Sequence, residues 1–476
     1  MITIPSFRTI APFYPENPPF SPGLRYPEYS FGSLSSQGNE VYDAVRSLLF
    51  QMGFDKEHFG TPEWNPFSHL IKPGDRVVIK PNWVHHMNPA EKDMLGMVTH
   101  TAVIRPVVDY VVKALGDSGE IIIGDAPIQS ANFKLLMRKT GMDQTLDFLE
   151  SKTRSAIRLK DFRREITVRK KGIVLSREFR NEGEFLEVNL KEKSFLYDIR
   201  QDYRKFRVTN YDKNKMLRYH NEKDSIYVIH KDVVDADAII YLPKLKAHRK
   251  AGITNCLKNS IGINGQKDCL AHHRKGSLAE GGDAYREKDI LKRLKENIAE
   301  VFDRSGNKNI QRILRFVNKI VHRLDLVYRK DPFFEGSWYG NDTLWRVILD
   351  LAIILFHLKP DGQIGDDVQR QILYVVDGIV AGEKDGPLRP SNKKLGVLAA
   401  GDNPLFLDVA CARIIGFDYT KIPSLYQGLV HGLFGLDTER VIDEKLYMNS
   451  KLITLKALNP VSALVPACGW IDHIEL

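Results

Sequence analysis

The chain has 476 residues, enough for two or three average domains or for one large α/β domain with insertions. With 43% hydrophobic and 27% charged residues, the composition excludes a disordered chain and indicates an ordinary globular one. Lys and Arg outnumber Asp and Glu by 69 to 60, so the formal charge is +9. This charge suits an anionic small ligand, a membrane surface or nucleic acid, and does not choose among them.

The cysteines are few and scattered, with no C-x-x-C pair. They are Cys256, Cys269, Cys411 and Cys468. This spacing argues against a zinc ribbon, a disulfide framework and a ferredoxin-type iron–sulfur cluster. The N-terminus lacks a basic segment followed by an apolar one, so we expect no signal peptide. Reduced thiols and a cytoplasmic location are the simplest expectation.

Five short runs rich in Val and Ile each end in polar residues. They are RVVIK-PNW (76–83), EIIIG-DAP (120–127), AIIYL-PKLK (238–246), YVVDG-IVAGEKDG (374–386) and GVLAA-GDNP (396–404). Runs of this length suit strands buried on both faces of a parallel sheet. Helical periodicity follows at 101–115, ended by Gly116, and after GDNP, where Asp402 or Asn403 would cap the helix. The sequence therefore predicts a doubly wound, mostly parallel α/β sheet.

Two segments interrupt this pattern. The charge-rich residues 151–222, with the short runs EITV, GIVLSREF and EFLEVNL, predict an antiparallel β-rich insertion, and residues 286–370 predict a helical insertion. The two insertions divide the expected core into three parts, at 71–150, 223–285 and 371–476, which follow an N-terminal extension at 1–70. The apolar stretch 344–358 contains Arg346 and Asp350 and is too short to span a bilayer. It predicts a buried helix, capped by Asn341 or Asp342.

A second helix of the helical insertion is basic and amphipathic. Its apolar stripe comprises Ile310, Ile313, Leu314, Val317, Ile320, Val321 and Leu324, and its basic face comprises Lys308, Arg312, Arg315, Lys319 and Arg323. Such a helix can lie on an anionic membrane surface, or it can be a solvated surface helix. A peripheral membrane contact through residues 310–324 therefore remains open.

Ligands of doubly wound sheets bind outside the carboxyl ends of the strands, so we expect the five polar turns to meet at one edge. This expectation groups Lys80, Asn82, Asp125, Lys244, Lys246, Asp377, Glu383, Asp385, Asp402 and Asn403. Asp and Asn are also ordinary turn residues, but lysine is not. Lys80, Lys244 and Lys246 are therefore the stronger indications of a binding site.

The stretch from Tyr241 to Lys267, YLPKLKAHRKAGITNCLKNSIGINGQK, holds six Lys or Arg, one His and no acid. Its Gly- and Asn-rich second half would let backbone amides approach an anion, although it matches no standard nucleotide-binding motif. A solvated basic face is the alternative. We predict a substrate-binding set of Lys80, Asn82, Asp125, Lys244, Lys246, Lys258, Asn259, Asn264 and Arg274.

Histidines accompany these cations and are candidates for proton transfer. The candidates are His100, His248, His272 and His273. Acidic residues follow later in the chain, where Glu383 and Asp385 lie in a Gly-rich segment that suits Mg²⁺ or another divalent metal. Lys384 lies between them and could instead pair with one of them.

These residues resemble a known family, the domain of unknown function 362 proteins. The similar stretches are VVIKPNWV, GDAP, YLPKLKAHRKAGITNCLKNSIGING, HHRKGS with GGDAY, GSWYGNDTLWR, DGIVAGEKDGPL with AAGDNPLFLDVA, and the terminal ACGWIDHIEL. Many relatives carry a ferredoxin-like iron–sulfur module, but this chain lacks the cysteines for one. Its longer form resembles variants found among surface-polysaccharide biosynthesis genes. The resemblance supports a shared strand-end site and supplies no reaction.

The leading hypothesis is an enzyme acting on an anionic substrate, a phosphorylated or nucleotide-linked sugar, with a divalent cation. An alternative is a His/Lys carbon-acid isomerase or racemase acting on a carboxylate. A non-catalytic, membrane-associated binding protein is the third possibility. Nucleic acid is not an expected partner, because no recognition motif is present and the net charge is small for this length.

Overall fold

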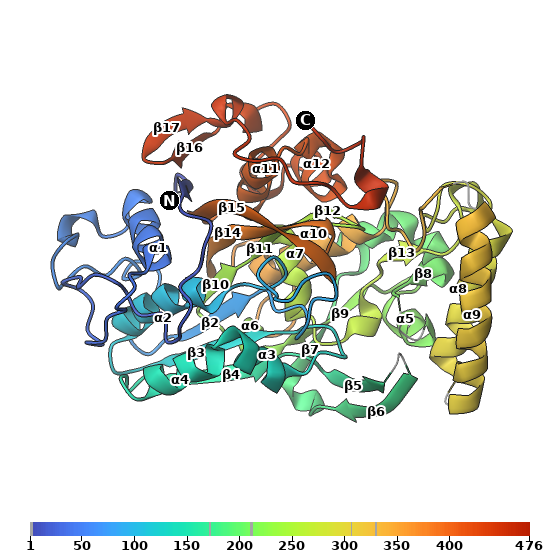
Figure 1. Ribbon diagram of the computed structural model, residues 1–476, viewed down its shortest axis with the longest axis horizontal. Coiled ribbons are helices and arrows are strands. Elements are labelled where there is room, and N and C mark those ends of the chain that lie inside the picture. The colour runs from blue at the N-terminus through green and yellow to red at the C-terminus, as the bar shows by residue number, and fades with distance from the viewer. Residues whose placement is uncertain (1–2, 171–172, 210–212, 306, 329–330) are drawn as a thin grey trace.

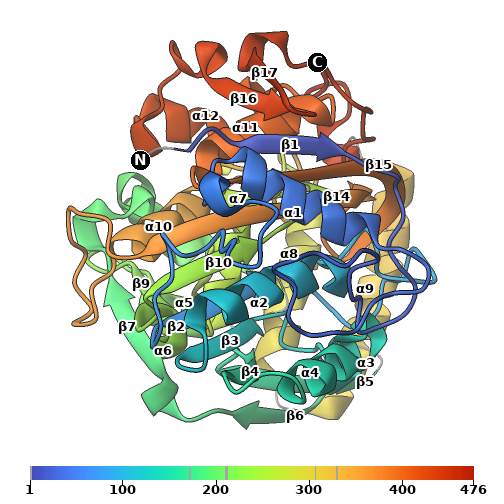
Figure 2. The same ribbon diagram turned by 90° about the vertical axis from the view of Figure 1, so that its left-hand side faces the viewer.

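The computed structural model describes residues 3–170, 173–209, 213–305, 307–328 and 331–476. At its centre lies an 11-stranded sheet in the order β17-β16-β1-β15-β14-β10-β2-β3-β4, with β11 beside β14 and β12 beside β11. Figure 2 shows most of this order, from β4 at the bottom to β16 and β17 at the top. The strands are β1 (Ser6–Thr9), β2 (Arg76–Pro81), β3 (Glu120–Asp125), β4 (Ala156–Asp161), β10 (Ala238–Leu242), β11 (Lys244–His248), β12 (Gly252–Thr254), β14 (Gln371–Asp385), β15 (Arg389–Gly401), β16 (Lys445–Met448) and β17 (Lys451–Thr454).

The middle of the sheet is parallel and buried on both faces. Strands β4, β3, β2, β10 and β14 run parallel to one another. Successive side chains alternate between two cores: Val77 and Ile79 of β2 lie in one, and Val78 lies in the other. The predicted α/β fold with a mostly parallel sheet is therefore confirmed.

Helices cover both faces of this sheet. The α-helices of the described chain are α1 (Glu40–Gln51), α2 (Thr101–Leu115), α3 (Phe133–Thr140), α4 (Met142–Glu150), α5 (Lys213–Tyr219), α6 (Lys231–Val234), α7 (Cys256–Asn259), α8 (Ile290–Arg304), α9 (Lys308–Tyr328), α10 (Leu344–His357), α11 (Pro404–Ile414) and α12 (Pro423–Val430). Residues of α1 and α2 share a core with Val77 and Ile79, while α10 and α11 share the other with Val78.

Three predicted helix boundaries agree with the structure. Gly116 ends α2 with a positive φ of 62°, where a residue with a side chain would be strained. The Asn341 Oδ1 accepts hydrogen bonds from the backbone N–H groups of Thr343 and Leu344 at the start of α10. Asn403 caps α11 by accepting from two backbone N–H groups.

The predicted common edge for all five polar turns is wrong. Strand β15 pairs antiparallel with β14, so its carboxyl end, with Asp402 and Asn403, lies at the opposite end of the sheet. There the Asp402 carboxylate accepts a hydrogen bond from the Thr3 backbone. Strand β14 does not turn after Asp377 but continues to Asp385. An apolar run shows that both faces of a strand are covered, but it does not show the strand's direction.

The two insertions form small units around the sheet. Residues of the first build the antiparallel pair β5 (Glu165–Lys170) and β6 (Ile173–Phe179) and supply β7 (Phe185–Asn189) and β8 (Phe206–Arg207), which pair with β9 (Ile226–His230) and β13 (His273–Arg274). Helices α8 and α9 of the second stand together along the outer edge of the molecule (Figure 1). Across the described ranges, no helix has both the length and the apolar character needed to cross a bilayer.

Candidate functional site

A cavity of about 250 Å³ opens at the carboxyl ends of β2 and β3, beside β11. The loops after β2 and β3 form one wall, and β11 with its following turn forms another. The segment from α7 to His272 forms a third wall. Side chains distant in sequence, among them Thr167, Thr209 and Leu388, complete the lining. The cavity thus lies where parallel α/β sheets usually bind ligands.

Four lysines of the described chain line the cavity, and among the described residues none of them has an acidic hydrogen-bond or ion-pair partner. Lys246 donates to the Met97 carbonyl at 2.6 Å, and Lys250 donates to the Thr209 hydroxyl at 3.0 Å. Lys267 donates to the backbone carbonyl oxygens of Asn264 and Ile261, at 3.1 and 3.3 Å. All of these acceptors are neutral oxygen atoms, so none of these hydrogen bonds brings a negative charge to the ammonium groups.

The fourth lysine, Lys258, projects from α7 and lines the cavity. Within the described part of the chain, its ammonium group has no hydrogen-bond partner and no ion pair. Burial, together with the neighbouring charges of Lys80 and Lys250, lowers the pKa of Lys258 to about 8. Burial also lowers the pKa values of Lys250 and Lys267 to about 7. Such depressed values mark cations that an anion would stabilise.

One carboxylate, that of Asp125, lines the cavity, and it is already fully engaged. It accepts from the Lys80 ammonium at 2.8 Å and from the backbone N–H groups of Trp83 and Ala126, at 2.6 and 2.9 Å. Lys80 also donates to the Asn259 Oδ1 at 2.8 Å, so it belongs to a buried network in the wall. Gly262 packs so closely on this network that a side chain there would overlap Asp125 and Lys80.

Two histidines on the cavity wall are held in opposite tautomers. The His248 Nδ1 accepts from the backbone N–H groups of Lys250 and Ala251, both at 3.1 Å, so its proton resides on Nε2. The His272 Nδ1 lies 2.6 Å from the Leu270 carbonyl, which accepts only, so here the proton is on Nδ1 and Nε2 is a free acceptor. Burial, with the nearby lysines, lowers the pKa of both imidazoles well below its usual range. Both are therefore neutral, one with a donor and one with an acceptor at Nε2.

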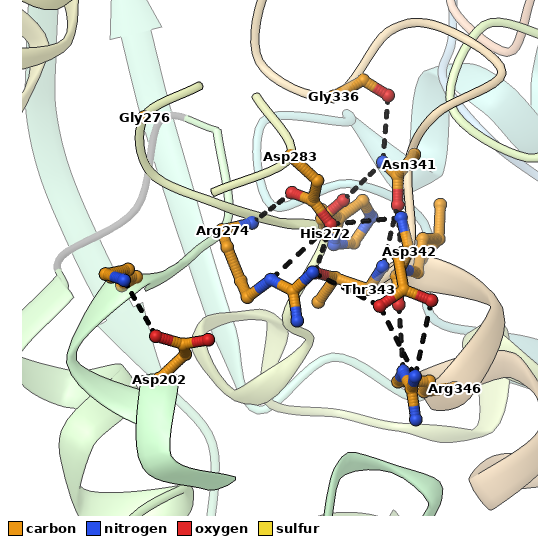
Figure 3. A network of polar contacts seen from close by, with 12 residues as sticks. Asp202, His272, Arg274, Gly276, Asp283, Gly336, Asn341, Asp342, Thr343 and Arg346 are labelled. Carbon is orange, nitrogen blue, oxygen red and sulfur yellow. Dashed lines mark hydrogen bonds and ion pairs between the residues drawn. The ribbon is translucent and has the colours of Figure 1, made fainter. Parts of the chain in front are cut away.

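A network of hydrogen bonds holds the backbone around His272 (Figure 3). The Asn341 side chain donates to the His272 carbonyl at 2.9 Å. The buried Asp283 carboxylate accepts from the Arg274 backbone, from the Asp342 backbone at 3.0 Å and from the Thr343 hydroxyl at 2.5 Å. The segments HHRKGS, GGDAY and GSWYGND are thus one structural unit that positions the histidine.

Several predicted site residues lie outside the cavity. Lys244 forms a fully buried ion pair with Asp377, at 3.0 Å, and donates to the Tyr14 hydroxyl at 2.7 Å. His100 stacks on Tyr14 and caps α2 through Nδ1. These two predictions are corrected, because neither side chain lines the cavity: Asp377 neutralises Lys244, and the His100 ring caps its own helix.

Three further predicted residues are structural. The Asn264 side chain bonds to the backbone of Val228 and Gln266. Arg274 lies beside Asp283 and Asp342 instead of facing the cavity. His273 is buried in β13 and does not line the cavity. Of the predicted set, Asn82, Asp125, Lys246, Lys258, Asn259, His248 and His272 do line it.

The carboxylates predicted to hold a metal do not face these cations across the cavity. Asp385 is exposed at the end of β14, and the Glu383 carboxylate accepts from the Val465 backbone at 3.1 Å. Among the described residues, no group of three His, Cys, Asp or Glu is placed to hold a metal ion. Because strand β14 continues past Asp377, Glu383 and Asp385 lie farther along the β14–β15 hairpin.

Sequence reasoning missed two of the four cavity lysines, Lys250 and Lys267. Both belong to the acid-free stretch 241–267, whose excess of cations indicated a binding site. The sequence did not show which of its side chains point into the cavity. Thr167 and Thr209 were also missed. They come from the β-rich insertion, and no local pattern marks them as lining residues.

The comparisons with known proteins identify the family. The model of the domain of unknown function DUF362 matches residues 77–190 and 192–413, so the chain belongs to this family. A comparison with curated proteins found no match.

Two solved structures show a distant likeness. A Thermotoga maritima protein solved as a structural-genomics target is 11% identical, with a TM-score of 0.34, 79% of this chain covered and 58% of that one. The lactate racemase apoprotein of Thermoanaerobacterium thermosaccharolyticum is 13% identical, with a TM-score of 0.32, 87% of this chain covered and 62% of that one. The chain thus spans less than two thirds of either structure. Because likeness at this level says nothing about activity, the function must be inferred from the cavity.

Proposed function

We propose that the cavity binds a small anionic substrate, and that His272 takes a proton from it and returns one, with His248 as a hydrogen-bond donor. The observation that carries this proposal is the pair of neutral histidines in opposite tautomers on the wall of a cavity lined by lysines. A neutral base and a neutral hydrogen-bond donor at the same pH are what removal of a carbon-bound proton needs. The proposal favours the isomerase or racemase hypothesis.

The size of the cavity favours a small substrate. Pockets for drug-sized ligands usually measure roughly 300–1,000 Å³, and this cavity measures about 250 Å³. A hydroxy acid or a monosaccharide phosphate fits this volume better than a nucleotide-linked sugar does. Apolar side chains such as Ile128, Ile261 and Leu270 share the lining and would contact the carbon skeleton.

The proposed reaction begins at the carbon next to the substrate's carboxylate or carbonyl group. The C–H bond breaks and its proton passes to the His272 Nε2. The electron pair of that bond forms a carbon–carbon double bond, and the carbonyl or carboxylate oxygen takes up the negative charge. The Lys258 ammonium would stabilise that oxygen, since it has no other partner. His248 donates an Nε2–H hydrogen bond to the same oxygen, and the His272 imidazolium then returns its proton to the same carbon or to the neighbouring one, so both histidines end as they began. No oxidant or reductant is consumed.

The direct test is the exchange of a carbon-bound proton. Purified protein is incubated in D₂O with single 2-hydroxy acids and sugar phosphates, with Mg²⁺ or with EDTA, and loss of the C–H signal is followed by ¹H NMR. We expect exchange with one class of anion and a loss of about 100-fold or more in His272→Gln and His248→Gln. The exposed His58→Gln is the matched control and keeps full exchange.

Two results would contradict the proposal. One is undiminished exchange in both folded cavity variants. The other is the absence of any anion that raises the melting temperature of the native protein, because a ligand bound only by the folded state must raise it.

A further inference from the structure

Helix α9 carries an apolar surface that the rest of the described chain leaves uncovered. It packs mainly against α8, with a small contact to β6, and its buried residues are Gln311, Val321 and Asp325. The exposed apolar and aromatic side chains of the helix are Ile310, Ile313, Phe316, Val317, Ile320, Leu324, Leu326, Val327 and Tyr328. Ile313 and Phe316 expose 63% and 65% of their surface. An apolar patch of this kind on a surface helix marks an interaction site.

The remaining exposed surface of α9 is cationic. Lys308, Arg312, Arg315, Lys319 and Arg323 lie beside the apolar stripe, and all are exposed. The single acid of the helix, Asp325, is buried and paired with Lys295 at 3.0 Å. Helix α9 therefore presents apolar side chains and positive charge without an exposed acid. This is the composition of helices that lie in the interface of an anionic membrane.

Two other partners suit this surface less well. The apolar residues recur with a spacing that a coiled-coil seam would share, but Phe316 widens the stripe beyond such a seam. Pairing with a second copy through α9 would also bring together two helices whose exposed charges are all positive, and like-charge repulsion opposes this. Nucleic acid would attract the cations but would leave the isoleucines and Phe316 in water.

We infer that α9 docks the protein on anionic phospholipid headgroups, with Ile313, Phe316 and Ile320 entering the interface. The arginines and lysines beside them contact lipid phosphate. The position of the α8–α9 pair along the outer edge of the molecule leaves α9 accessible (Figure 1). This docking site is separate from the cavity and does not depend on the proposed reaction.

Co-sedimentation of the full-length protein with vesicles tests the inference. The vesicles are made of phosphatidylcholine alone or of phosphatidylcholine with phosphatidylglycerol at 7:3. We expect binding to the anionic vesicles alone, weakened by raising the salt concentration. Replacing Arg312, Arg315 and Lys319 by Glu should weaken binding by about tenfold or more. Replacing Ile313, Phe316 and Ile320 by Ser should do the same.

The matched control reverses three exposed lysines elsewhere: Lys72→Glu, Lys152→Glu and Lys451→Glu. It changes the net charge equally and should keep binding. Circular dichroism melts establish that each variant is folded. The inference is overturned if the native protein ignores anionic vesicles, or if both α9 variants bind like the control. It is also overturned if light scattering finds a dimer that the serine variant dissociates while vesicle binding is absent.

Discussion

At the scale of single residues, the most informative group is the Lys258 ammonium. It lines the cavity without a partner in the described chain, and burial holds its pKa at about 8. A charge in this state is costly to the free protein and is stabilised when an anion arrives. The neighbouring Lys246, Lys250 and Lys267 differ from it because each donates to a neutral oxygen.

This arrangement predicts how anion affinity depends on pH. Below pH 7, Lys250, Lys258 and Lys267 are charged. Lys250 and Lys267 lose their protons as the pH rises through about 7, and Lys258 loses its proton through about 8. Because an anion binds the charged form, the Kd measured by calorimetry should rise by up to about tenfold per pH unit for each lysine required.

Arginine at position 258 provides the control, since its guanidinium stays charged throughout this range. Lys258→Arg should therefore weaken the pH dependence between pH 8 and 9.5, while Lys258→Met should bind the anion poorly at every pH. A Kd that is constant from pH 6.5 to 9.5 in the native protein would exclude a role for these lysines.

At the scale of elements, the loop that carries His272 depends on side chains from the helical insertion. Asp283 is buried and accepts three hydrogen bonds, while Arg274 lies beside it (Figure 3). The start of α10 and the loop are thereby fixed together. The helical insertion thus contributes to the site even though its long helices α8 and α9 do not line the cavity.

Removing this carboxylate should destabilise the protein and disorder the histidine. Asp283→Ala leaves the backbone N–H groups of Arg274 and Asp342 and the Thr343 hydroxyl without their acceptor, so we expect a loss of about 2–4 kcal/mol in the free energy of unfolding. Urea unfolding followed by fluorescence measures it. Asp202→Asn, which removes a partly exposed pair with Lys205, should cost less than about 1 kcal/mol. Equal losses in the two variants would contradict the scaffold role of Asp283.

At the scale of the whole molecule, Asp377 ties four distant segments together. It pairs with Lys244 of β11, accepts from the Tyr14 hydroxyl at 2.6 Å and accepts from the His100 backbone at 3.0 Å. The N-terminal extension, the start of α2, β11 and β14 therefore meet at one buried carboxylate. Its role is to join the parts of the fold.

Breaking this ion pair should act on stability. Lys244→Met leaves Asp377 buried without its countercharge, so we expect a loss of about 3 kcal/mol or more. Adding Asp377→Asn removes the unpaired charge and should recover about half of that loss. Thermal unfolding measures both variants. If Lys244→Met instead abolished anion binding in a folded protein of native stability, Lys244 would belong to the binding site after all.

The local sequence determined those helices and strands that are marked by patterns within a few residues, such as apolar periodicity, capping residues and apolar runs. Periodicity placed the helices at 101–115 and after GDNP, and Gly116, Asn341 and Asn403 end or cap helices as their chemistry predicts. The runs of Val and Ile fixed the five core strands, because a strand covered on both faces must be apolar throughout. The acid-free stretch 241–267 likewise identified the cationic wall.

The tertiary structure alone decided which of these residues face the cavity. Lys244, Lys246 and His248 occupy every second position of β11. Even so, Lys244 is neutralised by Asp377, 133 positions later in the chain, while Lys246 and His248 line the cavity. The direction of β15 moved Asp402 and Asn403 to the far end of the sheet. The charge of a side chain and the local backbone conformation are determined by the residue itself and its neighbours in sequence. The partner that neutralises a charge, or leaves it free for a ligand, is set by contacts between distant parts of the chain.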